Sequence, residues 1–162
     1  MSSRFRDRQV TAWEFTDEVL VHCPRCRGRA VLVPPPGTST ADSRWRRRLV
    51  CPACGHAEDL TSHVVAYPGN QGRPDLCDPF DLGLRLFLQV PCRGEVLWAF
   101  NHAHVDYLES CVAASLRERS RRPDAPNAWH RRMTMTAKLP AWVKSAKNRD
   151  EVRRALARLR AL

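Results

Sequence analysis

Two Cys-Pro-x-Cys pairs, Cys23/Cys26 and Cys51/Cys54, constrain this chain more than any other feature of its sequence. A C-x-x-C pair lies on a tight turn, so both of its sulfurs can face one ion. Structural Zn²⁺ sites take four thiolate or imidazole ligands in a tetrahedron, with Zn–S bonds of about 2.3 Å. The two pairs supply those four ligands, and we therefore predict one zinc ion bound by all four cysteines.

The predicted zinc site is structural, because a catalytic site keeps one ligand position open for water and four thiolates leave none. His22 and His56 flank the pairs and are the nearest alternative ligands. A redox C-x-x-C is another interpretation, but it would need a thioredoxin-like βαβ setting and would leave the second pair unexplained. Gly55 directly follows Cys54, where a tight turn often needs a positive φ. In the first pair Gly28 comes one residue later, so we expect the two turns to differ slightly.

Short β-prone runs surround both pairs, at residues 17–22, 29–34, 44–50 and 56–67. With "CPRC" and "CPACG" between them, this part of the chain resembles the zinc ribbons of transcription factors. The resemblance implies a small antiparallel β module over residues 19–66, and zinc ribbons as a class bind DNA, RNA or protein partners. The Pro-rich stretch 34–43 is expected to be an exposed loop, and we expect the metal to fix the loop at 35–50.

The next segment has the pattern of a β-hairpin followed by a helix. Apolar residues alternate with other residues over 84–90, the turn sequence "PCRG" follows, and 95–100 is β-prone again. Asn101 is a good N-cap, and a helix is expected from His102 to Ser120. Its apolar-to-small stripe consists of Val105, Leu108, Val112, Ser115 and Leu116.

The C-terminal part is expected to be helical, with one helix over 128–139 that Pro140 stops and another over 149–161. The predicted fold class is therefore α+β: a small zinc ribbon, a β-hairpin–helix segment and a basic helical tail. The expected organisation is an arm at 1–18, the ribbon at 19–66, the hairpin–helix segment at 67–120 and the tail at 121–162.

A second resemblance covers the ribbon, residues 78–120 and "KLPAWVKSAKNRDEVRRAL" at 138–156. These stretches are similar to an uncharacterised bacterial group of zinc-ribbon proteins sometimes labelled primosomal-helicase-like. The group has no established activity to transfer. The helicase label itself does not apply, because the sequence has no G-x-x-x-x-G-K-[ST] phosphate loop.

Positive charge is the second large feature of the sequence. The formal net charge is +10, and residues 101–162 hold 14 Lys and Arg against 6 Asp and Glu. Such a stretch attracts polyanions, above all nucleic acid, through counterion release. Aromatic residues beside arginines suit base stacking together with phosphate contact. The candidate nucleic-acid-binding residues are Trp45, Arg46, Arg47, Arg48, Arg121, Arg122, Trp129, Arg131, Arg132, Lys144, Lys147, Arg153 and Arg154.

Three functions stay open at this point. The first is a non-enzymatic protein that binds nucleic acid through Arg–phosphate contacts. The second is an adaptor that docks on a larger nucleoprotein, defence or transcription complex. The third is an enzyme that uses a cluster of carboxylates and histidines, which comprises Asp78, Asp81, His102, His104, Asp106 and Glu109.

Seven cysteines and the lack of a signal-peptide-like apolar stretch favour a cytoplasmic protein, in which thiols stay reduced. No run approaches the roughly 18 apolar residues of a membrane helix, so no membrane partner is expected. Cys77, Cys92 and Cys111 match no zinc pattern, and we expect them to be loop thiols or small apolar residues. The oligomeric state is open.

Overall fold

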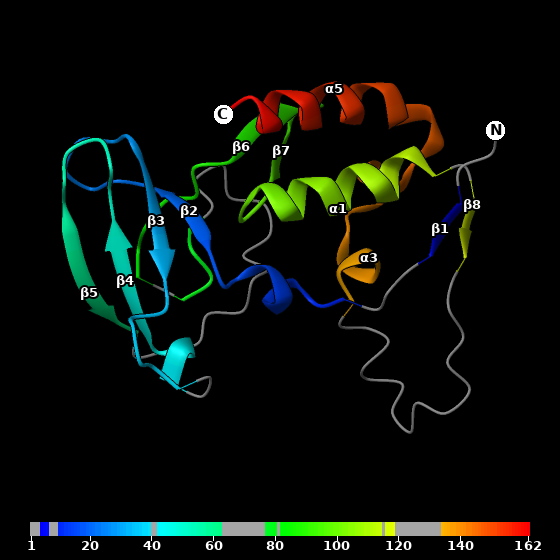
Figure 1. Cartoon of the computed structure of the whole chain (residues 1–162). Helices are drawn as coiled ribbons and strands as arrows, with labels where there is room; N and C mark the ends of the chain where they lie inside the picture. The colour runs from blue at the N-terminus through cyan, green and yellow to red at the C-terminus, as the bar shows by residue number, and fades with distance from the viewer. Residues whose placement is uncertain are drawn as a thin grey trace.

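The computed structural model describes residues 4–6, 10–39, 42–62, 77–80, 82–114, 116–118 and 134–162. It has helices together with mainly antiparallel strands, so the fold is α+β (Figure 1). The strands are β1 (Arg4–Arg6), β2 (Val19–His22), β3 (Arg29–Val33), β4 (Arg46–Val50), β5 (Ala57–Thr61), β6 (Gln89–Cys92), β7 (Glu95–Trp98) and β8 (Leu116–Glu118). The helices are α1 (His102–Ala113), α3 (Met135–Lys138), α4 (Ala141–Lys144) and α5 (Arg149–Arg160), with 3₁₀ turns at Ala12–Phe15, Asp42–Arg44 and Ala146–Asn148.

The predicted ribbon forms a four-stranded antiparallel sheet in the order β2-β3-β4-β5. Since side chains alternate between the faces of a strand, one face carries a continuous apolar set. This set is fully buried and contains Val19, Val21, Ala30, Leu32 and Leu49. In such a meander the β2–β3 and β4–β5 turns lie at one end of the sheet. The 34–45 connection therefore lies at the other end.

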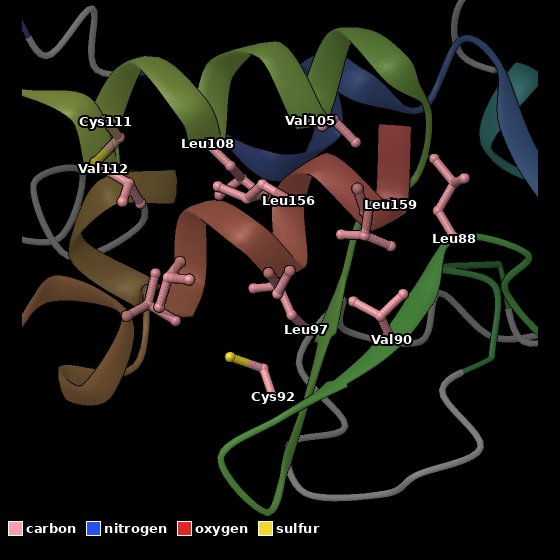
Figure 2. Packing of buried hydrophobic residues seen from close by; sticks show 14 of the residues in the cluster. Leu88, Val90, Cys92, Leu97, Val105, Leu108, Cys111, Val112, Leu156 and Leu159 are labelled. Atoms are coloured by element: carbon pink, nitrogen blue, oxygen red, sulfur yellow. The ribbon is translucent and has the colours of Figure 1, made fainter. Parts of the chain in front are cut away.

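A second layer is formed by the β6–β7 hairpin and the helices α1 and α5. Arg93 and Gly94 join the two strands with φ of 56° and 78°, the pair of positive values that a two-residue type I′ turn requires. Figure 2 shows apolar side chains from the hairpin and both helices meeting in one cluster. The expected hairpin is therefore present, with its turn at Arg93–Gly94.

The ribbon and the second layer are joined through β2. Leu20 points away from its neighbours Val19 and Val21 and packs in the cluster of the hairpin and helices. Its N–H donates to the carbonyl of Phe100, and its carbonyl accepts from the N–H of Phe87. Each strand face thus contributes to a different hydrophobic cluster, and the sheet is packed into the rest of the protein.

The predicted alternation over 84–90 is correct, since Leu84, Leu86, Leu88 and Val90 are all buried. The prediction that residues 84–90 form a single strand of the hairpin is wrong. Leu86 forms a bridge with Val21 of the ribbon, and only Gln89–Cys92 pairs with β7. One chain segment therefore pairs first with the ribbon and then with the hairpin.

Helix α1 begins after Asn101, whose side chain accepts from the N–H of His104, as the N-cap prediction required. The predicted end at Ser120 is wrong. Ala114 is extended, with ψ of 127°, and its carbonyl accepts from Arg149. Residues 116–118 then form β8, parallel to β1. The sequence has no glycine or proline there, so the helix end depends on tertiary contacts.

The last helix agrees with its predicted range. Its apolar side chains Val152, Ala155, Leu156 and Leu159 are 0% exposed and pack against α1 and the hairpin. This part of the predicted tail therefore belongs to the main core. Of the helix expected over 128–139, residues 128–133 lie outside the described residues, and α3 spans Met135–Lys138. None of the helices in the described ranges has the length and apolar character that crossing a membrane requires.

Candidate metal centre

The four predicted zinc ligands come together at one end of the ribbon sheet. The sulfurs of Cys23, Cys26, Cys51 and Cys54 all lie within 4.8 Å of one another. The Sγ atoms of Cys23 and Cys54 are 3.8 Å apart, and those of Cys26 and Cys51 are 3.5 Å apart. A tetrahedron with metal–sulfur bonds of about 2.3 Å has edges of about 3.8 Å. The spacing therefore fits one tetrahedral ion bound by four thiolates.

The two cysteine turns have the same backbone hydrogen bonds. In the first knuckle, residues 23–28, the N–H of Cys23 donates to the carbonyl of Gly28, and the N–H of Arg27 donates to that of Cys23. In the second knuckle, residues 51–56, Cys51 and Gly55 make the equivalent bonds, to His56 and Cys51. The two turns therefore close with the same backbone hydrogen bonds, and the slight difference expected between them concerns where the glycine lies.

The left-handed position of each knuckle directly follows its second cysteine. Gly55 has φ of 70°, as predicted, and Arg27 has φ of 61°. An L residue in this region costs about 1–2 kcal/mol relative to glycine. Gly28 has a different role: a Cβ there would lie 3.3 Å from the sulfur of Cys26. The first knuckle therefore places its glycine where space is short and an arginine where the backbone is strained.

The electrostatics of the four sulfurs favour a bound cation. Burial raises the pKa of Cys23, but backbone N–H groups of Cys26 and Arg25 and the neighbouring thiols outweigh it and lower that pKa to about 6. At Cys26 the N–H of Gly28 lowers the pKa, but the thiols of Cys51 and Cys54 raise it to about 12. One thiolate therefore forms readily, and its negative charge disfavours ionisation of a second thiol nearby. A bound divalent ion would reverse this effect and favour the ionised form of all four sulfurs.

Both flanking histidines bind protein groups other than the four cysteines. The Nδ1–H of His22 donates to the carbonyl of Arg27 at 3.0 Å, and its ring lies against Phe87. The Nε2 of His56 is 3.3 Å from a carboxylate oxygen of Glu58. The four cysteines form the one cluster with metal-binding geometry among the described residues. Of the remaining cysteines, Cys77 is exposed, whereas Cys92 and Cys111 are buried.

The predicted cluster on β4 divides between the two faces of the sheet. Trp45 is 42% exposed, and Arg46 is exposed. Arg48 is half-buried and forms a bidentate pair with Asp59 on β5, with distances of 2.7 and 2.9 Å. This pair lowers the pKa of Asp59 and raises that of Arg48. Arg46 is therefore the arginine of this strand that is both exposed and without a hydrogen bond among the described residues.

Arg47 faces the opposite way, into the protein. It is 3% exposed, and its guanidinium lies over the ring of Phe80. Because strand side chains alternate, a run of three arginines cannot present all its members on one face. The structure therefore places Arg47 away from any surface that a nucleic acid would contact.

In the C-terminal part, Lys147, Arg153 and Arg154 are exposed, and Lys144 is half-buried with its Nζ 3.3 Å from the carbonyl of Ala137. The other predicted contacts of this part lie outside the described residues: Arg121, Arg122, Trp129, Arg131 and Arg132. Two further arginines of α5 are exposed but bind groups of this chain. Arg158 donates to the carbonyl of Pro91, and Arg160 pairs with Asp106 and Glu109.

The described members of the 78–109 group of carboxylates and histidines have different surroundings. Asp78 is buried, and its carboxylate accepts from the N–H groups of Phe80, Leu82 and Leu84. His104 is buried, and its Nδ1 accepts from the N–H of Phe100. Asp106 and Glu109 are on the surface with Arg160, and Asp81 lies outside the described residues. These groups stabilise loops, the start of α1 and the contact with α5.

Sequence reasoning did not select three exposed arginines of the first ribbon hairpin, Arg25, Arg27 and Arg29. The sequence did contain an indication of them, because an arginine occurs at every second position of "CPRCRGR". The expectation that the metal fixes the 35–50 loop stays a prediction: β4 (Arg46–Val50) leads directly into Cys51, whereas residues 35–45 do not. The order of the antiparallel strands puts the two cysteine turns at the end of the sheet opposite the 34–45 connection.

A scan against known protein families and searches of curated proteins and of solved structures each found no match.

Proposed function

We propose that this chain is a non-enzymatic zinc-ribbon protein that binds nucleic acid mainly through arginine–phosphate contacts. Zinc is the metal that best suits the site, because four thiolates at tetrahedral spacing are the preferred donors of a structural zinc ion. With all four positions taken by sulfur, the ion stabilises the ribbon and leaves no place for a reacting water.

The observation that supports nucleic-acid binding is a set of exposed arginines that form no hydrogen bond or ion pair among the described residues. Arg46, Arg153 and Arg154 are exposed, and none has a hydrogen bond or ion pair within the described ranges. Unpaired guanidinium groups are suited to bidentate phosphate contact. Trp45, exposed next to Arg46, adds an aromatic face on which a base can stack.

The salt dependence of binding tests this proposal. The zinc-loaded protein is titrated with a duplex, a single-stranded DNA and an RNA of unrelated sequences at several salt concentrations. We expect log K to fall linearly with log[salt], with a slope of about −0.9 per phosphate contacted on a duplex or about −0.7 on a single strand. Lack of binding to all three at low salt would refute the proposal.

A second candidate is the adaptor role, which two exposed apolar residues at the ends of β4 favour: Val50, the last residue of β4, and Trp45, which directly precedes the strand. Trp45 and Val50 are the large apolar side chains most exposed in the ribbon's described part. On this alternative, a protein surface covers them. A nuclease-treated pull-down from the native cell separates the two: partners that survive nuclease support the adaptor, and partners that are lost support nucleic acid.

A further inference from the structure

The two knuckles share a backbone but differ completely in charge. At the three equivalent positions the first hairpin has Arg25, Arg27 and Arg29, and the second has Ala53, Gly55 and Ala57. The second knuckle shows that this turn forms and closes around cysteines without any arginine. The arginines of the first knuckle are therefore not required by the turn itself.

Arg27 adds a second, independent observation. It holds the left-handed backbone position, with φ of 61°, where the equivalent residue of the other knuckle is a glycine. A long side chain at such a position strains the backbone, and strained residues are concentrated at functional sites. The chain has an arginine at the position of the turn where glycine would be the more stable residue.

These three side chains also lack internal partners. All three are exposed, and none has a hydrogen bond or ion pair through its side chain within the described part of the chain. By contrast, Arg48 is paired with Asp59, and Arg160 with Asp106 and Glu109. The guanidinium groups at the first knuckle are therefore available to an anionic partner, whereas most of those predicted on β4 are not.

We propose that the first knuckle is the main phosphate-binding element of the protein, with Arg25, Arg27 and Arg29 contacting phosphates of a nucleic acid. The inference rests on the proposed function and names its contact surface. Because Cys23 and Cys26 close the same turn, the bound metal holds these arginines in place. Nucleic-acid affinity therefore depends on the metal.

The test compares two triple variants of the zinc-loaded protein. R25Q/R27Q/R29Q removes the knuckle charges, and K147Q/R153Q/R154Q removes three exposed charges elsewhere. Each lowers the formal net charge of +10 by three, so the bulk electrostatic change is matched. We expect the knuckle variant to bind nucleic acid about 10- to 100-fold more weakly and to lose about two to three phosphates from its salt slope. The second variant removes exposed C-terminal charges that the proposed function also uses, so it should weaken binding too, but it should lose fewer phosphates from its salt slope than the knuckle variant.

Equal losses in the two variants, or a larger loss in the second variant, would overturn the inference while leaving the proposed function intact. If wild type binds no nucleic acid at low salt, the proposed function itself fails. Zinc content is measured for every variant. If the knuckle triple loses zinc, the single variants R29Q and R154Q decide, since Arg29 lies outside the Cys23–Cys26 turn. If R29Q and R154Q bind nucleic acid with equal affinity, the inference is again overturned.

Arg27→Gly provides the sharpest single test, because stability and binding should change in opposite directions. Relief of backbone strain should keep or raise the melting temperature, and zinc content should not change. Affinity for nucleic acid should fall, and the salt slope should decrease by about one phosphate. An R27G protein with wild-type affinity would contradict the inference.

Discussion

The guanidinium carbon of Arg47 lies 3.9 Å from the centroid of the Phe80 ring, and both side chains are buried. Its Nε and Nη1 atoms have no hydrogen-bond partner within the described residues. Burial lowers the pKa of Arg47 to about 10, although Asp17 opposes the change. The stacking contact thus holds a charge in an environment that disfavours charge.

Arg47→Met should therefore raise the free energy of unfolding slightly, by less than about 1 kcal/mol. The substitution loses a cation–π contact of about 2 kcal/mol but also removes a poorly solvated charge. Urea denaturation measures the difference, and nucleic-acid affinity should stay at the wild-type value. A loss above about 2 kcal/mol would show that the buried charge is strongly stabilising.

His104 is the buried group that should make stability depend on pH. Its Nδ1 accepts from the N–H of Phe100, so the neutral ring carries its proton on Nε2, among the rings of Phe15 and Trp98. Burial lowers the pKa of His104 to about 3. The unfolded chain, with an ordinary histidine pKa of about 6.5, binds a proton first as pH falls.

The stabilising effect of a neutral His104 is complete above about pH 6.5 and is lost as pH falls from there toward 3, by about 1.4 kcal/mol per unit. Comparing urea denaturation of zinc-saturated wild type and His104→Gln between pH 8 and 5.5 should show a shallower pH slope in the variant. His102→Gln is the control, since His102 lies half-buried at the start of α1. A wild-type slope in H104Q would contradict this assignment.

Local patterns predicted the elements well. The alternation at Leu84–Val90, the Asn101 cap and the cysteine spacing each depend on a few neighbouring residues, and each is present in the structure. The end of α1 was not predictable in this way. Ala114 has no helix-breaking neighbour, and its extended conformation is associated with burial and a contact from Arg149, 35 residues further on.

The candidate binding surface was less predictable than the metal site. A charge run does not reveal which side chains face inward, so Arg46, Arg47 and Arg48 were one group in the sequence and have three environments in the structure. Arg27 has a positive φ at the position that Gly55 holds in the other knuckle, and the charge pattern of the sequence does not indicate this.

The burial of α5 predicts that the end of the chain is essential for stability. Leu156→Ala should lower the free energy of unfolding by about 2–5 kcal/mol, because it opens a cavity between α1 and the hairpin (Figure 2). Arg154→Ala, on the exposed side of the same helix, should change it by less than about 0.5 kcal/mol. Equal, small effects would mean that α5 is not packed in the core.

The metal site predicts about one zinc per chain, and its removal should unfold the ribbon. Cys54→Ser takes away one of four ligands, so zinc should bind much more weakly, and the melting temperature should fall to that of the chelated wild type. Cys77→Ser is the matched control: Cys77 is also exposed but lies outside the cluster, so zinc content should not change.

Loss of the metal should also affect the second layer, because Leu20 of β2 packs in its core and pairs through its backbone with Phe87 and Phe100. Chelation should therefore lower the protection of amide hydrogens in β2 and in the contacts of Leu20, and not only at the knuckles. A protein that melts identically with and without chelator would contradict a structural zinc site. Full retention of protection around Leu20 after chelation would show that the two layers fold independently.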